Sequence, residues 1–309
     1  TKVQSSVLTF VYGESGSGKS TFLKLGLCRE LVGRWVPIYI DVWGTDWVGG
    51  PWKSLADATN YAVHELGIGG DGQPPVTRES VFEQLRTLRT RTGRRPLLIF
   101  DQVDDYQNAH RVRFRDPVTQ FFLSPDELCT ANPFWKEVRD LLLHPSEPVH
   151  IVLATREDAQ DGLHCFGFAE PRVYRLPRLD PQDALTLIQR LSPEAAIRNP
   201  ENGFTEITQR IVAELGRDGQ GAVLPMQLRI ALAGLGRLNG PLTPGRLDKL
   251  GGVSALGALY LDAVLRTSPE AWPILIAMAE RTPTGRGKAI TLPRERVFAL
   301  TPSGAQKDQ

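Results

Sequence analysis

The sequence has little cysteine and no long apolar run. Its three cysteines are too widely and irregularly spaced for a disulfide framework or a metal-binding CxxC pair; they are Cys28, Cys129 and Cys165. Its five histidines show no HxxxH or HxH spacing, so we expect no zinc site. No signal-peptide pattern and no apolar stretch of membrane-spanning length occurs. These absences predict a cytoplasmic protein in a reducing compartment, without a membrane segment.

The chain also lacks an excess of either charge. Its 36 Lys and Arg residues against 35 Asp and Glu residues give a net charge of +1. A nucleic-acid partner is therefore not indicated, because such proteins usually carry a basic excess. With 309 residues, of which 41% are hydrophobic, the chain is long enough for more than one domain. It starts almost directly on a predicted strand, and we expect it to be part of a longer protein.

Up to about residue 180, short apolar runs alternate with helical stretches, which predicts a parallel β-sheet covered by helices. The expected strands are Val7–Val11, Val36–Val42, Leu97–Phe100 and Val149–Ala154. The expected helices are Lys19–Leu31, Trp52–Leu66, Arg78–Arg91 and Trp135–Leu142. We predict loose loops at Gly69–Pro75 and Asn108–Pro133, and a loop as long as the second is usually functional or mobile.

Beyond Asp180 the strand pattern stops. Helices are expected at Pro181–Leu191, Phe204–Leu215, Met226–Leu238, Ser254–Arg266 and Trp272–Arg281. The tail Thr301–Gln309 is polar and predicted to be disordered. A boundary near Asp180 therefore separates an α/β part from a helical part, and a second boundary is expected near residue 240.

The stretch from Gly13 to Thr21, GESGSGKST, fits the phosphate-binding pattern GxxxxGK[ST] and lies between an apolar strand and a helix. Its glycines allow backbone N–H groups to wrap phosphate oxygens. Lys19 would reach the β and γ phosphates, Ser20 would bind Mg²⁺, and the helix would present its positive end. The residues expected to hold a nucleotide are Gly13, Ser15, Gly16, Ser17, Gly18, Lys19, Ser20 and Thr21.

A phosphate-binding loop predicts a second strand that ends in a carboxylate for the magnesium ion. The apolar run before Asp101 supplies this strand, and Asp101 follows at its carboxyl end. Asp104 and Asp105 come next, and either carboxylate could polarise an attacking water. The alternative for this pair is a solvated turn after the strand.

A further apolar strand ends in Thr155 and Arg156, which would reach the same crevice and could sense the γ-phosphate. The alternative is that Arg156 pairs with Glu157 or Asp158 at the surface. Asp41 and Asp46 flank the second strand and are expected to be cap or turn residues.

Four tryptophans gather around the second strand, at Trp35, Trp43, Trp47 and Trp52. Such a cluster usually belongs to the core or to a subunit contact. The alternative is an exposed partner surface.

Several segments together resemble the STAND ATPases, the signal-transduction ATPases with numerous domains, and in particular their novel bacterial type-one branch. LLIFDQVDD, from Leu97, resembles the family's apolar run followed by DQFEE. IVLATREDAQDGL, from Ile151, resembles its fourth strand with an arginine and an acidic pair. RLPRLDPQDALTLI, from Arg175, and LPMQLRIALAGL, from Leu224, are similar to the entry and the proline helix of its lid. LGGV, from Leu250, and TLPRERV, from Thr291, resemble the start and basic end of a winged-helix module.

The resemblance implies an α/β fold, a P-loop NTPase parallel sheet of the ASCE type, followed by a helical lid and a winged-helix-like module. The implied domains are residues 1–178, 179–240 and 241–309. Lys19 and Ser20 would hold phosphate and magnesium, and Asp101 the metal. Asp104 and Asp105 would be the catalytic acids and Arg156 the sensor. Pro225 would help the lid close on the nucleotide.

The function that this resemblance implies is a switch that binds ATP or ADP with Mg²⁺, hydrolyses slowly and self-associates on activation. The family's acidic pair usually contains glutamate, and the two shorter aspartates of this chain predict slow turnover. Base specificity follows from the resemblance alone. Effector and sensor domains would lie outside this chain, and antiviral defence is a role that the bacterial branch often has.

Two other functions remain open. An AAA+ remodeller would need steady turnover and a ring with an arginine supplied between subunits, and usually has an acid directly after the magnesium aspartate, where this chain has Gln102. A nucleotide-dependent scaffold would bind ATP without hydrolysis. A small-molecule kinase fits least, because its lid is short and rich in arginine.

Overall fold

The computed structural model describes residues 6–68, 77–145, 149–191, 201–238, 242–269, 273, 279–281 and 287–289. The chain divides into two compact units, Thr1–Arg178 and Leu179–Gln309. The predicted loop Gly69–Pro75, the segment Thr291–Val297 and the tail Thr301–Gln309 lie outside the described residues.

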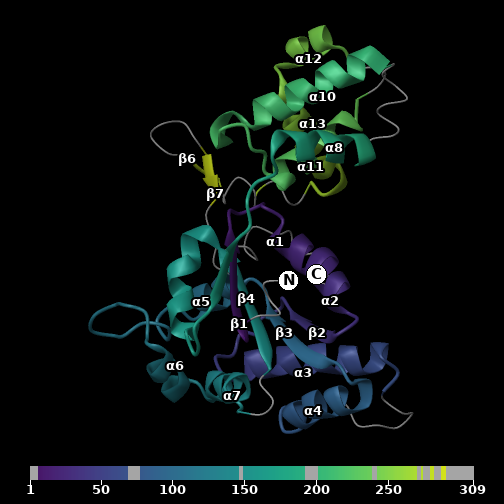
Figure 1. Cartoon of the computed structure of the whole chain (residues 1–309). Helices are drawn as coiled ribbons and strands as arrows, with labels where there is room; N and C mark the ends of the chain where they lie inside the picture. Colours follow the sequence, from purple (N-terminus) through teal and green to yellow (C-terminus); the bar gives the residue numbers. More distant parts are fainter. Residues whose placement is uncertain are drawn as a thin grey trace. The chain divides into compact units, whose positions relative to one another are not determined.

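The first unit is built on a five-stranded parallel sheet with the order β2-β3-β4-β1-β5 (Figure 1). The strands are β1 (Leu8–Gly13), β2 (Trp35–Ile40), β3 (Arg95–Phe100), β4 (His150–Arg156) and β5 (Arg172–Arg175). β4 lies between β1 and β3, which is the strand order of ASCE-type P-loop NTPases, and the predicted fold class is confirmed. The sequence pattern missed β5, because this short strand has arginines at both ends and no apolar run.

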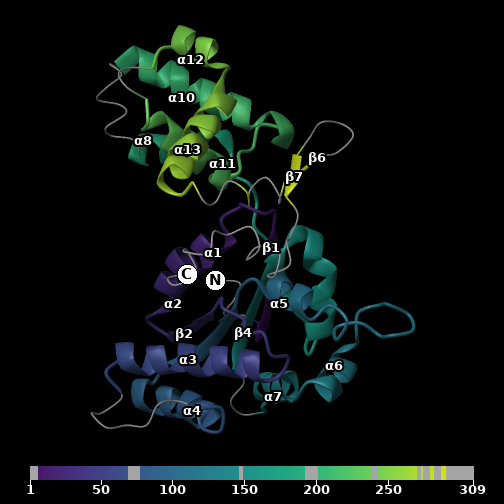
Figure 2. The same ribbon diagram turned by 180° about the vertical axis from the view of Figure 1, so that it is seen from behind.

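Helices cover both faces of this sheet, as Figures 1 and 2 show from opposite sides. One face packs against a single continuous helix made of α1 (Lys19–Thr21), the π-helical segment η2 (Phe22–Leu27) and α2 (Cys28–Leu31). The helices of the other face are α3 (Gly49–Glu65), α4 (Val81–Thr92), α5 (Val103–Ala109), α6 (Pro125–Ala131), α7 (Pro133–Leu142) and the 3₁₀ segment η3 (Glu157–Phe166).

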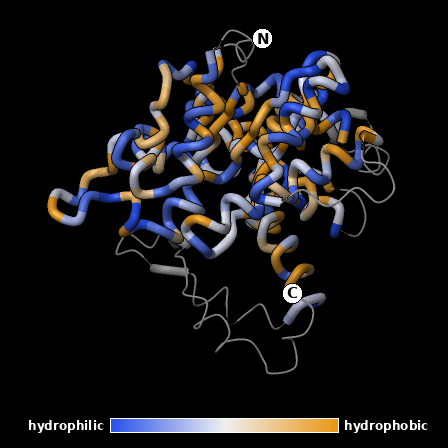
Figure 3. The backbone as a smooth tube through the Cα atoms, turned by 90° about the horizontal axis from the view of Figure 1, so that it is seen from below, coloured by the Kyte–Doolittle hydropathy of each residue, from blue (hydrophilic) through white to orange (hydrophobic). Residues whose placement is uncertain are grey.

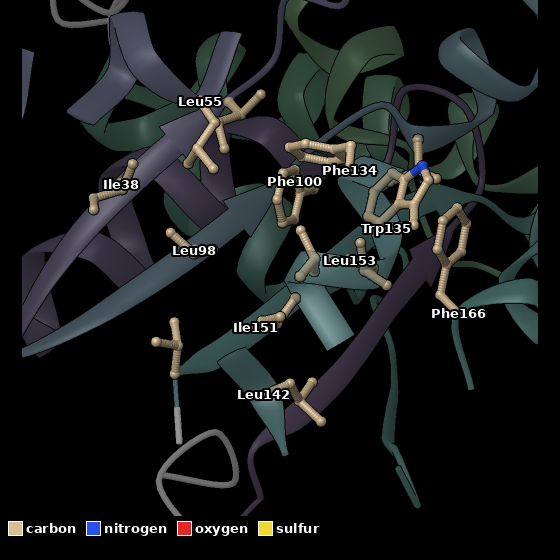
Figure 4. Close-up of a cluster of buried hydrophobic side chains, with 14 of the residues drawn as sticks. Ile38, Leu55, Leu98, Phe100, Phe134, Trp135, Leu142, Ile151, Leu153 and Phe166 are labelled. Atoms are coloured by element: carbon tan, nitrogen blue, oxygen red, sulfur yellow. The ribbon is translucent and has the colours of Figure 1, made fainter. Parts of the chain in front are cut away.

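Strands β1 to β4 are largely buried on both faces and divide their side chains between two cores. In β3, Leu97 and Ile99 belong to the core beneath α2, whereas Leu98 and Phe100 belong to the larger core beneath α3 to α7. This alternation is the period of two that a strand imposes. Figure 4 shows the larger core, where Phe100 lies close to Phe134 and Trp135.

The helix after the glycine loop is predicted as one α-helix, and the structure finds a π-helical middle in it. Its apolar residues Leu23, Leu27 and Leu31 are four apart and all buried. In a regular α-helix each step of four residues turns the side chain by about 40° beyond a full turn. The wider π turn takes up this drift, so the three leucines stay against the sheet.

The predicted loose loop Asn108–Pro133 is wrong over its second half, which forms α6. The helix starts with a capping box, in which the Ser124 hydroxyl accepts from Glu127 N and the Glu127 carboxylate accepts from Ser124 N. Pro125 occupies the first helical position, where its missing N–H costs nothing. These start signals define α6 where the hydrophobic pattern is too short to show it.

β2 forms one edge of the sheet and carries a proline in its middle. Arg95 N donates to Arg34 O at 3.1 Å and Asp101 N donates to Ile40 O at 2.8 Å, so the even-numbered backbone groups of β2 face β3. The odd-numbered groups, including that of Pro37, therefore face the open edge. A proline there removes the N–H that an added strand would need.

The second unit is mainly helical. Its described helices are α8 (Pro181–Leu191), α10 (Glu201–Leu215), the 3₁₀ turn η4 (Arg217–Gly219), α11 (Pro225–Leu235), α12 (Pro244–Leu250) and α13 (Val253–Thr267). α12 escaped the sequence pattern, although Thr243 caps it and Gly251 ends it in a left-handed conformation. One core joins Ile188, Leu228, Leu247 and Leu256. The division near residue 240 into a lid and a winged-helix-like module stays a prediction.

The predicted helix Trp272–Arg281 is wrong at its end. Ala279–Arg281 forms β6, which pairs antiparallel with β7 (Gly287–Ala289). β6 is a strand because it pairs with β7, which follows later in the chain. The residues of β6 alone therefore do not indicate a strand.

The crossing of α11 and α13 predicts opposite effects for two Gly→Ala substitutions. A Cβ on Gly234 would lie 1.9 Å from Leu256 O, so we expect Gly234→Ala to destabilise the unit by about 1–3 kcal/mol. A Cβ on Gly257 would meet only Ile230 Cγ2 at 3.7 Å, and Gly257→Ala should stabilise by ~0.5–1 kcal/mol through helix propensity. Urea unfolding of both variants measures the difference. Equal stabilities would contradict the close helix crossing.

Hydrophobic and hydrophilic stretches alternate along the helices in Figure 3, as expected for helices with one buried face. Among the described residues, no helix has the length and apolar character needed to cross a membrane.

Candidate functional site

The glycine loop connects the end of β1 to the start of α1. Gly16 and Gly18 have φ angles of 81° and 86°, a left-handed conformation that side chains with a Cβ rarely adopt. A Cβ on Gly13 would lie 2.9 Å from both Leu176 O and the Ser17 hydroxyl. Ser17 is buried, and its hydroxyl has no hydrogen-bond partner within the described structure. The loop is therefore closely packed beneath and turns its backbone in the way that a phosphate cradle requires.

Lys19 lies at the start of α1 and folds back over the loop. Its ammonium donates to Gly13 O at 2.8 Å and to Glu14 O at 3.0 Å. Desolvation lowers the pKa of Lys19, and the Asp104 and Asp101 carboxylates oppose this shift. The ammonium thus lies over the loop with acceptors that a phosphate could replace.

Asp101 follows β3 at the carboxyl edge of the sheet and is only 1% exposed. Its Oδ1 accepts from Gln102 N at 2.9 Å, and its Oδ2 accepts from the Tyr39 hydroxyl. Gln102 has a φ of 55°, unusual for a residue other than glycine, and this turn leads into α5. The carboxylate is fixed at both oxygens by the strand end and its neighbour β2.

Asp104 lies in the first turn of α5 and is 4% exposed. Its Oδ1 accepts from the Thr155 hydroxyl at 3.2 Å and from Arg156 N at 3.4 Å. Arg156 Nε lies 4.0 Å from Asp104 Oδ2, and the same guanidinium donates to Asp158, with Nε 3.0 Å from Oδ1. The structure thus brings Asp104, Thr155 and Arg156 together, and the surface pairing considered for Arg156 also occurs.

Asp105 is exposed beside Asp104. Desolvation raises the pKa of Asp105, and the nearby Asp104 carboxylate raises it further. A carboxylate with a raised pKa is a better proton acceptor than an ordinary aspartate, which suits a general base. The two aspartates therefore differ in surroundings, with Asp104 fixed to β4 and Asp105 open to solvent.

The residues around Asp101 fit a magnesium ion held jointly with phosphates. Asp101 is a buried carboxylate without a cationic partner among its hydrogen bonds, and the Ser20 hydroxyl lies near the Tyr39 hydroxyl that donates to Asp101. Such oxygen ligands suit Mg²⁺, which takes one or two protein groups and substrate phosphates. Within the described residues no group of three or more His, Cys, Asp or Glu side chains forms a self-sufficient metal cage.

Two contacts of the site escaped the sequence analysis. Arg178 binds Glu14 of the loop in a bidentate ion pair, with Nε–Oε1 and Nη2–Oε2 distances of 2.9 and 2.6 Å. The hydrogen bond from Arg178 lowers the pKa of Glu14. The Tyr39 hydroxyl is the second such contact, and its odd position in β2, shared with Asp101 in β3, could have indicated it.

The remaining predicted residues are Asp41, Asp46 and Pro225, and within the described structure neither aspartate forms a hydrogen bond or ion pair with the glycine loop or the acidic residues of the site. Asp46 accepts from the backbone N–H of Val48, as a turn residue does, whereas Asp41 forms an ion pair with Lys24 at 2.5 Å. Pro225 is the first residue of α11 in the second unit, and its role toward the nucleotide stays a prediction.

The tryptophan cluster belongs to the core. Trp35, Trp47 and Trp52 are buried, and Trp43 stacks on Phe100 and Tyr106. The alternative of an exposed partner surface is wrong for these side chains.

No family model and no curated protein matches the sequence. Similar solved structures include the ORC2 protein of Aeropyrum pernix in its ADPNP-ADP complexes, 15% identical over 96% of this chain and 86% of that chain, with a TM-score of 0.48. The Cdc6p protein of Pyrobaculum aerophilum is 12% identical over 79% of this chain and 56% of that chain, with a TM-score of 0.36. A chain of the E. coli MS115-1 HORMA:CdnC:Trip13 complex is 12% identical over 83% of this chain and 74% of that chain, with a TM-score of 0.43. The identities and TM-scores of all three structures are low. The fold assignment therefore follows from the strand order and the glycine loop of the chain itself.

Proposed function

We propose that this protein is an ATP- and ADP-binding signalling NTPase that hydrolyses slowly and acts as a conformational and oligomerisation switch. The observation that carries the proposal is the meeting of three strand ends at one edge of the sheet. β1 brings the glycine loop with Lys19, β3 brings Asp101, and β4 brings Arg156. Ligands of open parallel sheets bind at this edge.

The residues divide the work of binding between them. The loop N–H groups and the start of α1 would bind the phosphates, and Lys19 would exchange its carbonyl acceptors for phosphate oxygens. Asp101 and Ser20 would hold magnesium, which neutralises charge on the phosphates when bound. Arg156 would contact the terminal phosphate. These roles rest on the motif spacing and the positions of the side chains.

Slow turnover is supported by the contacts of Asp104 and Arg156. The Asp104 carboxylate accepts a hydrogen bond from Thr155 and faces Arg156, and the Arg156 guanidinium also donates to Asp158. A sensor held in ion pairs must give up contacts before it can stabilise a transition state, which opposes fast hydrolysis. The same feature favours a switch over an AAA+ remodeller, which needs continuous turnover. Gln102, which follows Asp101 where the remodellers usually have an acid, also favours a switch.

The switch predicts a nucleotide-dependent change in molecular mass. With ADP the full-length protein should be a monomer, and with a slowly hydrolysed ATP analogue and its trigger it should form a larger species. Multi-angle light scattering measures both states. A monomer under both conditions, together with tight nucleotide binding, would leave the scaffold function in place of the switch.

A further inference from the structure

The magnesium site has a third participant on the neighbouring strand. Tyr39 lies near the carboxyl end of β2, and its hydroxyl donates to Asp101 Oδ2 across the β2–β3 pair. The Ser20 hydroxyl lies near enough to the Tyr39 hydroxyl to lower the pKa of the phenol, against the larger effect of burial. The two side chains expected to bind the metal therefore lie beside one phenol oxygen.

The position of Tyr39 follows from strand geometry. Side chains at odd positions of β2 and β3 point to the face covered by α1, η2 and α2, because Tyr39, Leu97 and Ile99 pack in that core. Asp101 continues the same parity in β3, and Ser20 stands at the start of the covering helix. The phenol is thus directed at both groups by the pleat of the sheet.

Tyr39 is itself held in place on its other side. Lys24 Nζ lies 4.6 Å from the centre of its ring and forms an ion pair with Asp41 at 2.5 Å. The ring also lines a groove of 870 Å³ beside β2, to which Tyr61 of α3 contributes as well. A ring packed on a cation and fixed in a strand has little freedom to rotate, which suits a group that orients others.

We propose that Tyr39 is a positioning residue for Mg²⁺, holding the Asp101 carboxylate in place beside Ser20. This inference rests on the proposed nucleotide-binding function and adds a residue that the motif pattern does not contain. Asp101 Oδ1 is fixed by Gln102 N, so Tyr39 supplies the second donor that sets the plane of the carboxylate. Groups that orient metal ligands in this way typically contribute about 10–100-fold to metal affinity.

Tyr39→Phe tests the proposal because it removes one oxygen and keeps the ring. Affinity for ADP is measured by calorimetry in excess EDTA and over a series of Mg²⁺ concentrations. We expect the EDTA affinity to be unchanged and the Mg²⁺ concentration for half-maximal effect to rise about tenfold. Electron paramagnetic resonance of Mn²⁺ with ADP should show a similar loss of metal affinity.

Tyr61→Phe is the matched control, since Tyr61 lines the same groove and is 67% exposed. It should leave both affinities unchanged. If Tyr39→Phe shows the wild-type dependence on Mg²⁺, or a stronger metal affinity, the positioning role is wrong. If the wild-type protein binds ADP neither in EDTA nor with Mg²⁺, the proposed nucleotide function fails instead, so the two failures are distinguishable.

Discussion

Lys19→Ala should strongly weaken nucleotide binding. The Lys19 ammonium lies over the glycine loop, 2.8 Å from Gly13 O and 3.0 Å from Glu14 O, where it would meet the terminal phosphates. Hydrogen bonds to charged groups contribute about 1.5–3 kcal/mol each, so the loss of this cation should weaken ADP and ATP binding by at least ~100-fold. Calorimetric titration with Mg-ADP measures the change.

The matched control for this prediction is Lys53→Ala. Lys53 is exposed on α3 and pairs with Asp57 at 2.5 Å, so its removal changes the net charge equally without touching the loop. Nucleotide should also raise the melting temperature of the wild-type protein and of Lys53→Ala, because a ligand that binds only the folded state stabilises it. Wild-type affinity in Lys19→Ala would disprove the assignment of the loop.

Asp104→Asn should spare nucleotide binding and reduce hydrolysis by about 100-fold or more, the range of a lost general acid–base group. The substitution keeps the size of the side chain but removes the charge that faces Arg156 Nε at 4.0 Å. Arg156 would then be held by Asp158 alone. Single-turnover hydrolysis with ADP affinity measured in parallel separates the chemical step from binding.

Asp105→Asn completes the comparison. Asp105 has a raised pKa and is open to solvent, so it is the stronger candidate for a proton acceptor if Asp104 serves only to hold Arg156. Unchanged turnover in Asp104→Asn together with a loss of turnover in Asp105→Asn would identify Asp105 as the proton-accepting carboxylate. Unchanged turnover in both variants would argue against a catalytic role for either aspartate, whereas nucleotide binding without turnover in the wild-type protein would favour a scaffold.

The sequence predicted the parts of the fold that carry strong local signals. Apolar runs revealed strands β1 to β4, whose side chains are largely buried, and the glycine spacing revealed the phosphate loop. β5 was missed because Arg172–Arg175 forms a strand only through its pairing with β1. The end of the helix predicted at Trp272–Arg281 failed for the same reason, since β6 exists through β7. Pairing between distant segments leaves little trace in a local pattern.

The candidate site shows the same division. Motif spacing named Lys19, Asp101 and Arg156, each of which lies at the predicted sheet edge. It did not name Tyr39 or Arg178, because their contacts depend on strand order and on a loop that returns beside the glycine loop. Tyr39 and Arg178 contact residues that are distant in the sequence, so no motif with a fixed spacing identifies them.

The proline in β2 also bears on how a protein with an open sheet edge avoids aggregation at high local concentration. An assembly that gathers many copies places sheet edges near one another, and an open edge invites cross-β aggregation. Pro37 interrupts one edge of the sheet, and β5 at the other edge is four residues long with Arg172 and Arg175 at its ends. Within the described five-stranded sheet, neither edge thus offers a long unbroken strand on which a fibre could grow.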